Sequence, residues 1–262
     1  MTSTFVESAL ARIALDINPP LSRIVLRNPP LNVIDIPMME ELSRALGEVE
    51  ARPDISIVII SGGSNHFSAG VDVAAHTPDK VEEMLAKFHA VIRFLVATRK
   101  VTIAAVHGHC LGGGAELAMV CDLVFTTDSA QWGFPEIKLG CYPPVACTAL
   151  AALIGQKRAA ELILTGRTIS GTEAAAIGLA SRALPQEKID ISVDECVDRL
   201  KTLSASSLAV TKKALYAWDS MHFDKGLARA ERIYLEELMK TADAQEGICA
   251  FMEKREPNWT GK

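Results

Sequence analysis

The spacing of apolar residues changes along the chain, from strand-like patterns near the start to helical spacing near the end. Residues 12–16 and 22–27 alternate apolar and polar side chains around Pro19 and Pro20, which predicts a hairpin with a longer turn. Residues 55–61 and 101–107 are apolar runs rich in β-branched side chains, which are typical of buried strands. The same reasoning predicts further strands at 121–126 and 181–184, an irregular segment at 130–140, and helices at 37–52, 78–97, 144–155, 158–164, 172–178, 190–203, 205–218, 225–241 and 243–254.

The order of these elements indicates the fold class. Strands alternate with helices up to about residue 190, and helices alone follow. This order favours an α/β core with right-handed crossovers and a helical C-terminal region. We therefore divide the chain into residues 1–190 and residues 191–262. No linker separates the two parts, so we expect the helical region to pack on the core or on another subunit.

A glycine corner follows the strand at 101–107. Gly112, Gly113 and Gly114 come directly before a helix-like segment that carries Glu116 near its start. Glycine has no Cβ atom, so a ligand can approach the backbone there. The first N–H groups of a helix lack intrahelical partners and favour negative charge. The corner therefore predicts an anion-stabilising site, and the alternative interpretation is a tight turn whose glycines serve packing alone.

A second corner of the same design follows the strand at 55–61. It runs from Gly62 and Gly63 to the segment at residues 68–72. Ligands of parallel α/β sheets collect at the carboxyl ends of the strands. Two backbone corners at two strand ends can present two N–H donors to one oxygen, which is an oxyanion hole. The alternative for Ala69 and Gly70 alone is a plain turn.

Two acids accompany these corners. Glu136 follows Glu116 by twenty residues, in the irregular segment, between Phe134 and Ile137. Apolar neighbours raise the pKa of a carboxyl group, so we expect Glu136 to be able to donate a proton. Two carboxyl groups beside an oxyanion hole would allow a proton to be removed and delivered at one site. Either glutamate alone is also compatible with a solvated or capping carboxylate.

Other functions find little support in the sequence. The glycine triplet does not continue as G-x-G-x-x-G because Leu117 occupies the third glycine position, and the chain contains neither a P-loop nor a G-x-S-x-G nucleophile elbow. A net charge of -5 without long like-charge runs argues against nucleic acid or an acidic membrane surface. The six cysteines form no C-x-x-C pair, so we expect free thiols and no metal site.

The chain also has the composition of a globular protein, with 49% hydrophobic and 23% charged residues. Its first thirty residues carry no basic segment followed by an apolar one, and no apolar run reaches about 18 residues. We therefore expect neither secretion nor a membrane span, and we expect a cytoplasmic location.

Four segments together resemble the crotonase, or enoyl-CoA hydratase, superfamily over nearly the whole chain. Residues 68–72 (SAGVD) resemble the family's first oxyanion segment, and residues 111–118 with 121–122 resemble the second. Residues 134–140 (FPEIKLG) resemble the segment that holds the second acid, and residues 164–167 with 174–180 resemble the downstream pattern. Each segment is weak alone, but four in this order and spacing are specific.

The resemblance implies a core of stacked ββα units, a helical C-terminal part that trimerises, and a homotrimer or a hexamer built from two trimers. It implies an acyl-CoA thioester as substrate and no separate cofactor, because coenzyme A is part of the substrate. The oxyanion hole maps to the amides of Val71 and Gly113, and the catalytic acids map to Glu116 and Glu136. Substrate and CoA contacts map to Leu31, Ala69, Gly70, Asp72 and Gly112, and to Phe251 and Lys254 for a neighbouring subunit's CoA.

Two departures from the general pattern bear on the acyl group. Residues 141–147 (CYPPVAC) replace a glycine-rich helix start, so we expect a reshaped acyl pocket. Together with residues 29–36 (PPLNVIDI), this segment is similar to the cyclohexa-1,5-diene-1-carbonyl-CoA hydratases of anaerobic aromatic degradation. The resemblance therefore predicts hydration of an α,β-unsaturated, linear or cyclic, acyl-CoA. The alternatives are an enoyl-CoA isomerase on the same fold and a CoA- or RNA-binding homologue without catalysis.

Overall fold

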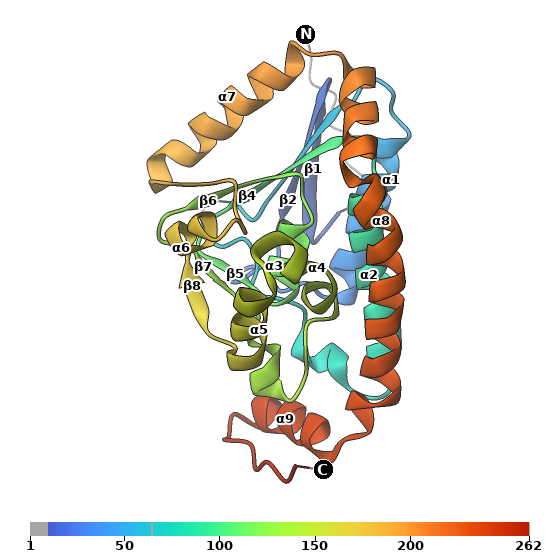
Figure 1. Ribbon diagram of the computed structural model, residues 1–262, viewed down its shortest axis with the longest axis vertical. Helices are drawn as coiled ribbons and strands as arrows, with labels where there is room; N and C mark the ends of the chain where they lie inside the picture. The colour runs from blue at the N-terminus through green and yellow to red at the C-terminus, as the bar shows by residue number, and fades with distance from the viewer. Residues whose placement is uncertain (1–9, 64, 262) are drawn as a thin grey trace.

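The computed structural model describes residues 10–261 except residue 64, and it describes residues 217–221 as backbone only. Strands and helices alternate up to β9, and helices form the rest of the chain (Figure 1), which confirms the expected α/β core with a helical C-terminal region. The strands are β1 (Ile13–Asn18), β2 (Leu21–Leu26), β3 (Ile57–Ser61), β4 (Val101–Val106), β5 (His109–Leu111), β6 (Leu123–Thr127), β7 (Gln131–Gly133), β8 (Thr168–Ser170) and β9 (Arg182–Leu184). The α-helices are α1 (Ile36–Glu50), α2 (Val81–Ala97), α3 (Gly113–Met119), α4 (Pro144–Ile154), α5 (Gln156–Thr165), α6 (Gly171–Ala176), α7 (Ile189–Lys201), α8 (Ala205–Glu236) and α9 (Ala242–Glu253). Short 3₁₀ helices are η1 (Val73–His76), η2 (Pro135–Leu139), η3 (Gln186–Lys188) and η4 (Leu238–Lys240).

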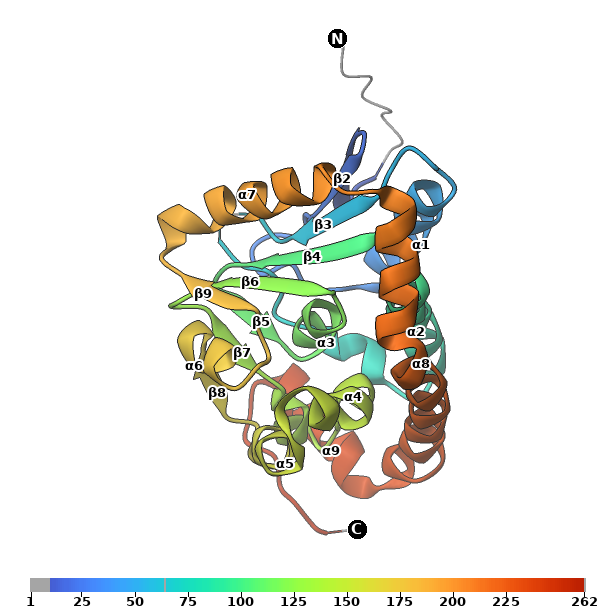
Figure 2. The same cartoon turned by 45° about the horizontal axis from the view of Figure 1, so that its top comes forward.

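The larger sheet has the strand order β1-β2-β3-β4-β6-β9. The predicted hairpin is confirmed, because β1 pairs antiparallel with β2, but the expected longer turn is wrong: Asn18 pairs with Leu21, and only Pro19 and Pro20 connect the strands. The four following pairings are parallel. A parallel strand buried on both faces needs apolar side chains in both directions. Ile57 and Ile59 accordingly belong to the cluster under α7, whereas Val58 and Ile60 face the main core. Figure 2 shows α7 crossing one face of this sheet.

A second sheet has the order β5-β7-β8. Its strands are three residues long, and the sequence analysis did not predict them. The segment 130–140, expected to be irregular, contains β7 and η2 instead. Strands this short carry too few residues for a period-2 pattern. This sheet matters for the site because β7 leads directly into the segment that carries Glu136.

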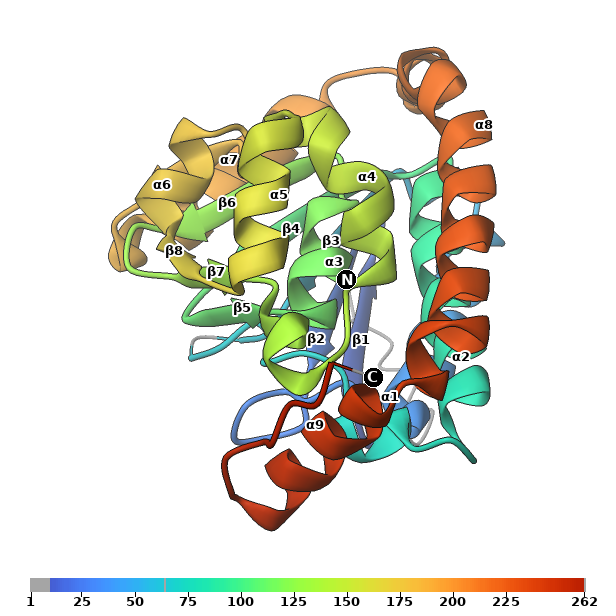
Figure 3. The ribbon, with the colours of Figure 1, turned by 60° about the horizontal axis from the view of Figure 1, so that its bottom comes forward.

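The predicted break between helices at 205–218 and 225–241 is wrong, because α8 runs unbroken for 32 residues. Gly226 lies within α8, and a Cβ atom there would come 2.7 Å from Thr148 Cγ2 on α4. The glycine therefore allows close packing of two helices and does not end one. Figure 3 shows α8 running alongside α2.

The C-terminal helices pack on the core. Lys212 on α8 is buried and forms an ion pair of 2.7 Å with Asp122 Oδ2, ahead of β6. Helix α9 contacts η1 and η2, and a Cβ atom at Gly247 would lie 2.3 Å from the carbonyl oxygen of Leu139. The end of the chain is thus tied to the segment that bears Glu136. No helix in the described part of the chain is both long and apolar enough to cross a membrane.

Candidate active site

The segment that leads to Val71 is fixed by hydrogen bonds to β5. The Ser68 amide donates to the carbonyl of His109 at 2.9 Å, and the Leu111 amide donates to the carbonyl of Ser68 at 3.0 Å. The Ser68 hydroxyl accepts from the Gly70 amide at 3.1 Å. Gly70 has a φ of +110°, which L side chains rarely adopt. These contacts hold the backbone at Val71 against the start of α3.

The amides of Val71 and Gly113 lie close to each other. A Cβ atom at Gly113 would be 3.4 Å from the Val71 nitrogen and 2.6 Å from its Cγ2. A Cβ atom at Gly70 would be 3.7 Å from the Gly113 nitrogen. Neither amide donates a hydrogen bond to another described residue. Glycine at these positions therefore leaves two unpaired N–H donors at one place, and Gly113 is also the first residue of α3.

Glu116 lies in the first turn of α3 and is 3% exposed. Its Oε1 accepts a hydrogen bond from the amide of Ala146, at the start of α4, at 2.9 Å. Burial raises the pKa of Glu116 to about 7, although the amides of Ala146 and Val145 favour the carboxylate. The Glu116 carboxyl group therefore has a pKa near neutrality, and its hydrogen bond to α4 fixes its direction.

Glu136 lies in η2, opposite Gly112. The Gly112 amide donates to the carbonyl of Gly133 at 2.9 Å, so the end of β7 is tied to the start of α3. A Cβ atom at Gly112 would lie 2.5 Å from Glu136 Oε1, and its φ is +51°. Glu136 Oε2 is buried and has no hydrogen-bond partner among the described residues. Burial, and next the charge of Glu116, raise the pKa of Glu136 well above its ordinary value.

The two carboxyl groups titrate as a pair. Like charges in one buried site disfavour double ionisation, so the pair holds one proton over a range of pH. The Ala146 amide stabilises negative charge on Glu116, whereas Glu136 Oε2 has no such donor. At intermediate pH the ionised carboxylate is therefore that of Glu116, and the protonated carboxyl group is that of Glu136.

A cavity of about 80 Å³ joins these groups. It is lined by seven of the residues singled out in the sequence, which are Ala69, Gly70, Val71, Gly112, Gly113, Glu116 and Glu136. Its remaining wall comes from η1 and α2, from Pro135, Leu139 and residues 141–144, and from Tyr234 on α8. Residues 141–144, part of the segment 141–147 that we expected to reshape an acyl pocket, thus lie on the cavity wall.

Four other residues singled out in the sequence do not line this cavity. The carbonyl of Leu31 accepts from the Ala69 amide at 2.9 Å, one layer behind the wall. The Asp72 carboxylate caps η1 by accepting from the Ala74 amide at 3.1 Å. Phe251 and Lys254 lie at the end of α9, where the Phe251 side chain is 55% exposed.

The described residues of the site do not form a cluster of metal-ligating side chains. No group of three or more His, Cys, Asp or Glu side chains in the described ranges could hold a metal ion. His107 and His109 flank the corner at Gly108 and do not line the cavity. His109 stacks on His66 instead, with ring centroids 4.6 Å apart.

Comparison with known proteins decides the family. The family model described as enoyl-CoA hydratase/isomerase matches residues 16–262. The chain belongs to the enoyl-CoA hydratase/isomerase family. This membership supports an enzyme of the acyl-CoA hydratase type that acts on an acyl-CoA thioester.

Individual relatives agree with this assignment. A cyclohexa-1,5-dienecarbonyl-CoA hydratase of Thauera aromatica is 34% identical over 255 residues, covering 97% of this chain and 98% of the relative. A protein named probable enoyl-CoA hydratase of Mycobacterium bovis is 37% identical over 240 residues, covering 90% and 93%. The crystal structure of an enoyl-CoA hydratase from Mycobacterium avium subsp. paratuberculosis has a TM-score of 0.86 at 26% identity, covering 96% and 99%.

Sequence patterns did not single out four polar side chains of this family member's cavity. His76 ends η1, His89 projects from α2, Tyr142 precedes α4, and Tyr234 lies in the last turn of α8. His89 occupies an ordinary core position in a helical pattern, so nothing in its own neighbourhood distinguishes it. Tyr142 lies within residues 141–147, whose departure from the general family pattern could have pointed to it. No comparable sequence feature points to Tyr234.

The raised pKa values lead to a stability prediction for Glu136→Gln. A carboxyl group whose pKa is raised on folding binds more protons in the folded state than in the unfolded one, so the free energy of unfolding falls as the pH rises above its ordinary value of 4.5. Replacing Glu136 by neutral glutamine removes this loss. We expect the variant to melt several degrees above the unmodified chain at pH 8, at about 2–4 °C per kcal/mol, with little difference at pH 4.

The control is Glu195→Gln on α7, where the side chain is exposed. This variant should melt at the temperature of the unmodified chain at both pH values. A Glu136→Gln variant that is less stable than the unmodified chain at pH 8 would contradict the assignment of a buried, unpaired acid.

Proposed function

We propose that this chain catalyses the addition of water across the α,β-double bond of an acyl-CoA thioester. The observation that carries the proposal is the placement around one cavity of two unpaired amides, the buried Glu116 and the buried, unpaired Oε2 of Glu136. Each part alone has a structural explanation. Their combination supplies both a site for negative charge on oxygen and a route for a proton.

The amides of Val71 and Gly113 stabilise the charge. Attack of water at Cβ moves the electrons of the double bond toward Cα and the thioester oxygen, which becomes enolate-like. N–H donors about 2.7–3.1 Å from that oxygen stabilise this state most, and loss of one such donor typically costs about 3–4 kcal/mol. The N-terminus of α3 adds positive potential at Gly113.

The acids move the protons. Glu116, ionised and oriented by the Ala146 amide, takes a proton from the water as its oxygen bonds to Cβ. Glu136, protonated, gives its proton to Cα as the enolate collapses. The charge thus passes from Glu116 to Glu136, and one proton transfer between the two acids restores the starting state. The raised pKa of each group supports these roles.

For the acyl group we propose a short or cyclic unsaturated chain, with a cyclohexadienoyl group as the finer candidate. The similarity to the Thauera aromatica relative supports the cyclic candidate. Pro143 and Pro144 support it physically, because they make a rigid wall beside both acids. Among linear substrates, the cavity favours short chains.

We further propose that the chain works as a trimer, in which Phe251 and Lys254 contact the CoA of a neighbouring subunit. Both residues lie outside the cavity of their own subunit. Exposed apolar side chains on α8 and α9, such as Val210, Leu215 and Met252, support an assembly of copies, since they would otherwise face water.

Heavy-oxygen labelling tests the reaction. The chain is incubated in ¹⁸O-labelled water with crotonyl-CoA and, separately, with cyclohexa-1,5-diene-1-carbonyl-CoA, and the products are analysed by mass spectrometry. Hydration predicts one ¹⁸O atom per product molecule. A shifted double bond without label would instead indicate an isomerase, and absence of any product from either thioester would contradict the proposal.

A further inference from the structure

His89 is a buried polar group that the proposed reaction does not use. It lies on the inner face of α2, is 0% exposed, and lines the same cavity as Glu116 and Glu136. Its neighbours Met84, Leu85 and Phe88 on α2 are apolar and buried. His89 is therefore the one polar side chain that α2 contributes to the described cavity wall.

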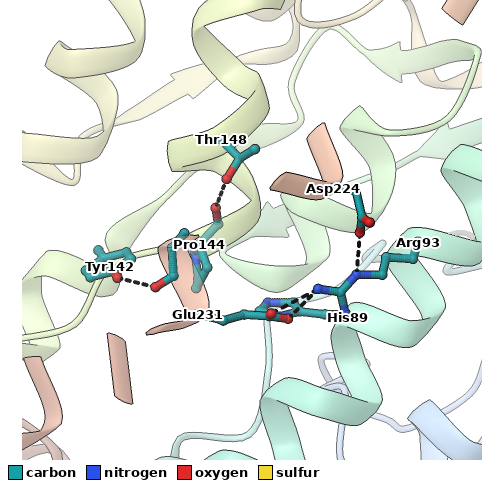
Figure 4. A network of polar contacts seen from close by, with 8 residues as sticks. His89, Arg93, Tyr142, Pro144, Thr148, Asp224 and Glu231 are labelled. Atoms are coloured by element: carbon teal, nitrogen blue, oxygen red, sulfur yellow. Dashed lines mark hydrogen bonds and ion pairs between the residues drawn. The ribbon is translucent and has the colours of Figure 1, made fainter. Parts of the chain in front are cut away.

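The orientation of His89 is set by α8. Its Nδ1 lies 2.6 Å from Oε1 of Glu231, and Arg93 binds both oxygens of Glu231 at 2.9 Å (Figure 4). Asp224 in turn accepts from Nε of Arg93 at 3.1 Å. A histidine held in this way has the arrangement of a base oriented by a carboxylate. The orientation of the ring is fixed because α2 carries the side chain and Glu231 on α8 binds its Nδ1 atom.

The network also decides which nitrogen carries the proton. Burial lowers the pKa of His89, so the ring is neutral near pH 7. Glu231 accepts at Nδ1, and therefore Nδ1 is the donor and Nε2 keeps its lone pair. Nε2 is consequently a hydrogen-bond acceptor of fixed direction.

That acceptor has no partner. His89 Nε2 is buried and forms no hydrogen bond with any other described residue. The hydroxyl of Tyr234, in the wall of the same cavity, is also buried beside the thiol of Cys141 without a hydrogen bond of good geometry. An unpaired buried polar group costs about 1–3 kcal/mol, so a ligand that supplies a hydroxyl group would recover part of that free energy.

We propose that His89 is a specificity-determining residue that accepts a hydrogen bond from a hydroxyl group on the acyl chain. The Tyr234 hydroxyl is the second hydrogen-bond partner of that same substrate hydroxyl group. The preferred substrates are then acyl-CoA thioesters that carry a hydroxyl group away from the reacting carbons. The inference rests on the proposed function only in placing the acyl chain in this cavity. Glu231 and Arg93 are positioning residues, because they act through His89.

Binding of saturated thioesters tests this proposal without any reaction. The matched ligands are pentanoyl-CoA and 4-hydroxybutanoyl-CoA, in which a hydroxyl group replaces the terminal methyl group, together with pairs one and two carbons longer. Calorimetry should show the hydroxyl ligand of at least one pair binding roughly tenfold more tightly than its alkyl partner. Equal affinity within every pair would overturn the proposal.

Three variants of His89 locate the effect. His89→Phe keeps an aromatic ring without an acceptor, and it should abolish the preference while leaving alkyl ligands bound at least as well. His89→Gln carries an amide at the position of Nε2 and should retain part of the preference, whereas His89→Asn reaches only to Nδ1 and should lose it. If His89→Phe does not fold, the Gln and Asn pair decides. Equal preference in the Gln and Asn variants would contradict the role of Nε2.

The outcome is separable from that of the proposed function. Water addition to crotonyl-CoA by the unmodified chain reports on hydration alone. Hydration without any preference for hydroxyl ligands would remove this inference and leave the proposed function intact. A preference that depends on His89, without hydration of any thioester, would keep the binding site and remove the proposed reaction.

Discussion

Replacing Glu136 by glutamine is expected to lower kcat for water addition about a thousandfold, since general acid–base catalysis contributes about 10²–10⁴. Glutamine has the shape of the protonated carboxyl group but cannot deliver its proton to Cα. Affinity for a saturated acyl-CoA should change little, because the amides of Val71 and Gly113 are untouched. Stopped assays with crotonyl-CoA measure kcat, and calorimetry measures affinity.

Glu116→Gln should give a loss of similar size for a different reason, because the base that takes the proton from water is lost. The double variant should be hardly worse than either single one, since the acids act as a unit. Glu195→Gln, on the exposed side of α7, serves as the control and should retain full activity. Full activity in both Gln variants at the site would contradict the assignment of the acids.

The second large effect is expected for Gly112→Ala. A Cβ atom there would lie 2.5 Å from Glu136 Oε1, so the carboxyl group must move away from its buried position. The backbone, with a φ of +51° and a ψ of -128°, is also one that alanine rarely adopts, at a cost of about 1–3 kcal/mol. We expect a loss of about a hundredfold in kcat together with a lower melting temperature, measured by steady-state assay and thermal unfolding.

Gly155→Ala is the matched control for backbone strain. Gly155 has a φ of +85°, and nothing lies within 4 Å of a Cβ atom built there. It connects α4 and α5, is exposed, and does not line the cavity that holds both acids. This variant should lose stability to a similar degree and keep its kcat, whereas an equal loss of kcat in both variants would show that the contact with Glu136 is unimportant.

The sequence predicted the parts of the fold that depend on local patterns. The runs at 55–61 and 101–107 are apolar and rich in β-branched side chains, and they became β3 and β4 at the centre of the larger sheet. Strands β5, β7 and β8 are defined by their pairing with one another and not by their own residues. The unbroken course of α8 depends on α4, because Gly226 lies where a side chain would meet Thr148.

The same distinction between local and long-range signals applies to the residues of the site. Gly112, Gly113, Glu116 and Glu136 were found because backbone corners and acids at short spacing carry their chemistry locally. The hydrogen bond that orients His89 could not be predicted, because its partner Glu231 is 142 residues away in the chain. The roles of Phe251 and Lys254 stay predictions, since they concern a neighbouring copy.

A crystal structure with a bound saturated acyl-CoA tests the central claim most directly. The thioester oxygen is expected about 2.7–3.1 Å from the nitrogen atoms of both Val71 and Gly113, with the carboxyl groups of Glu116 and Glu136 beside the α- and β-carbons. A thioester oxygen bound elsewhere, or held by one amide with both acids directed away from the acyl chain, would contradict it.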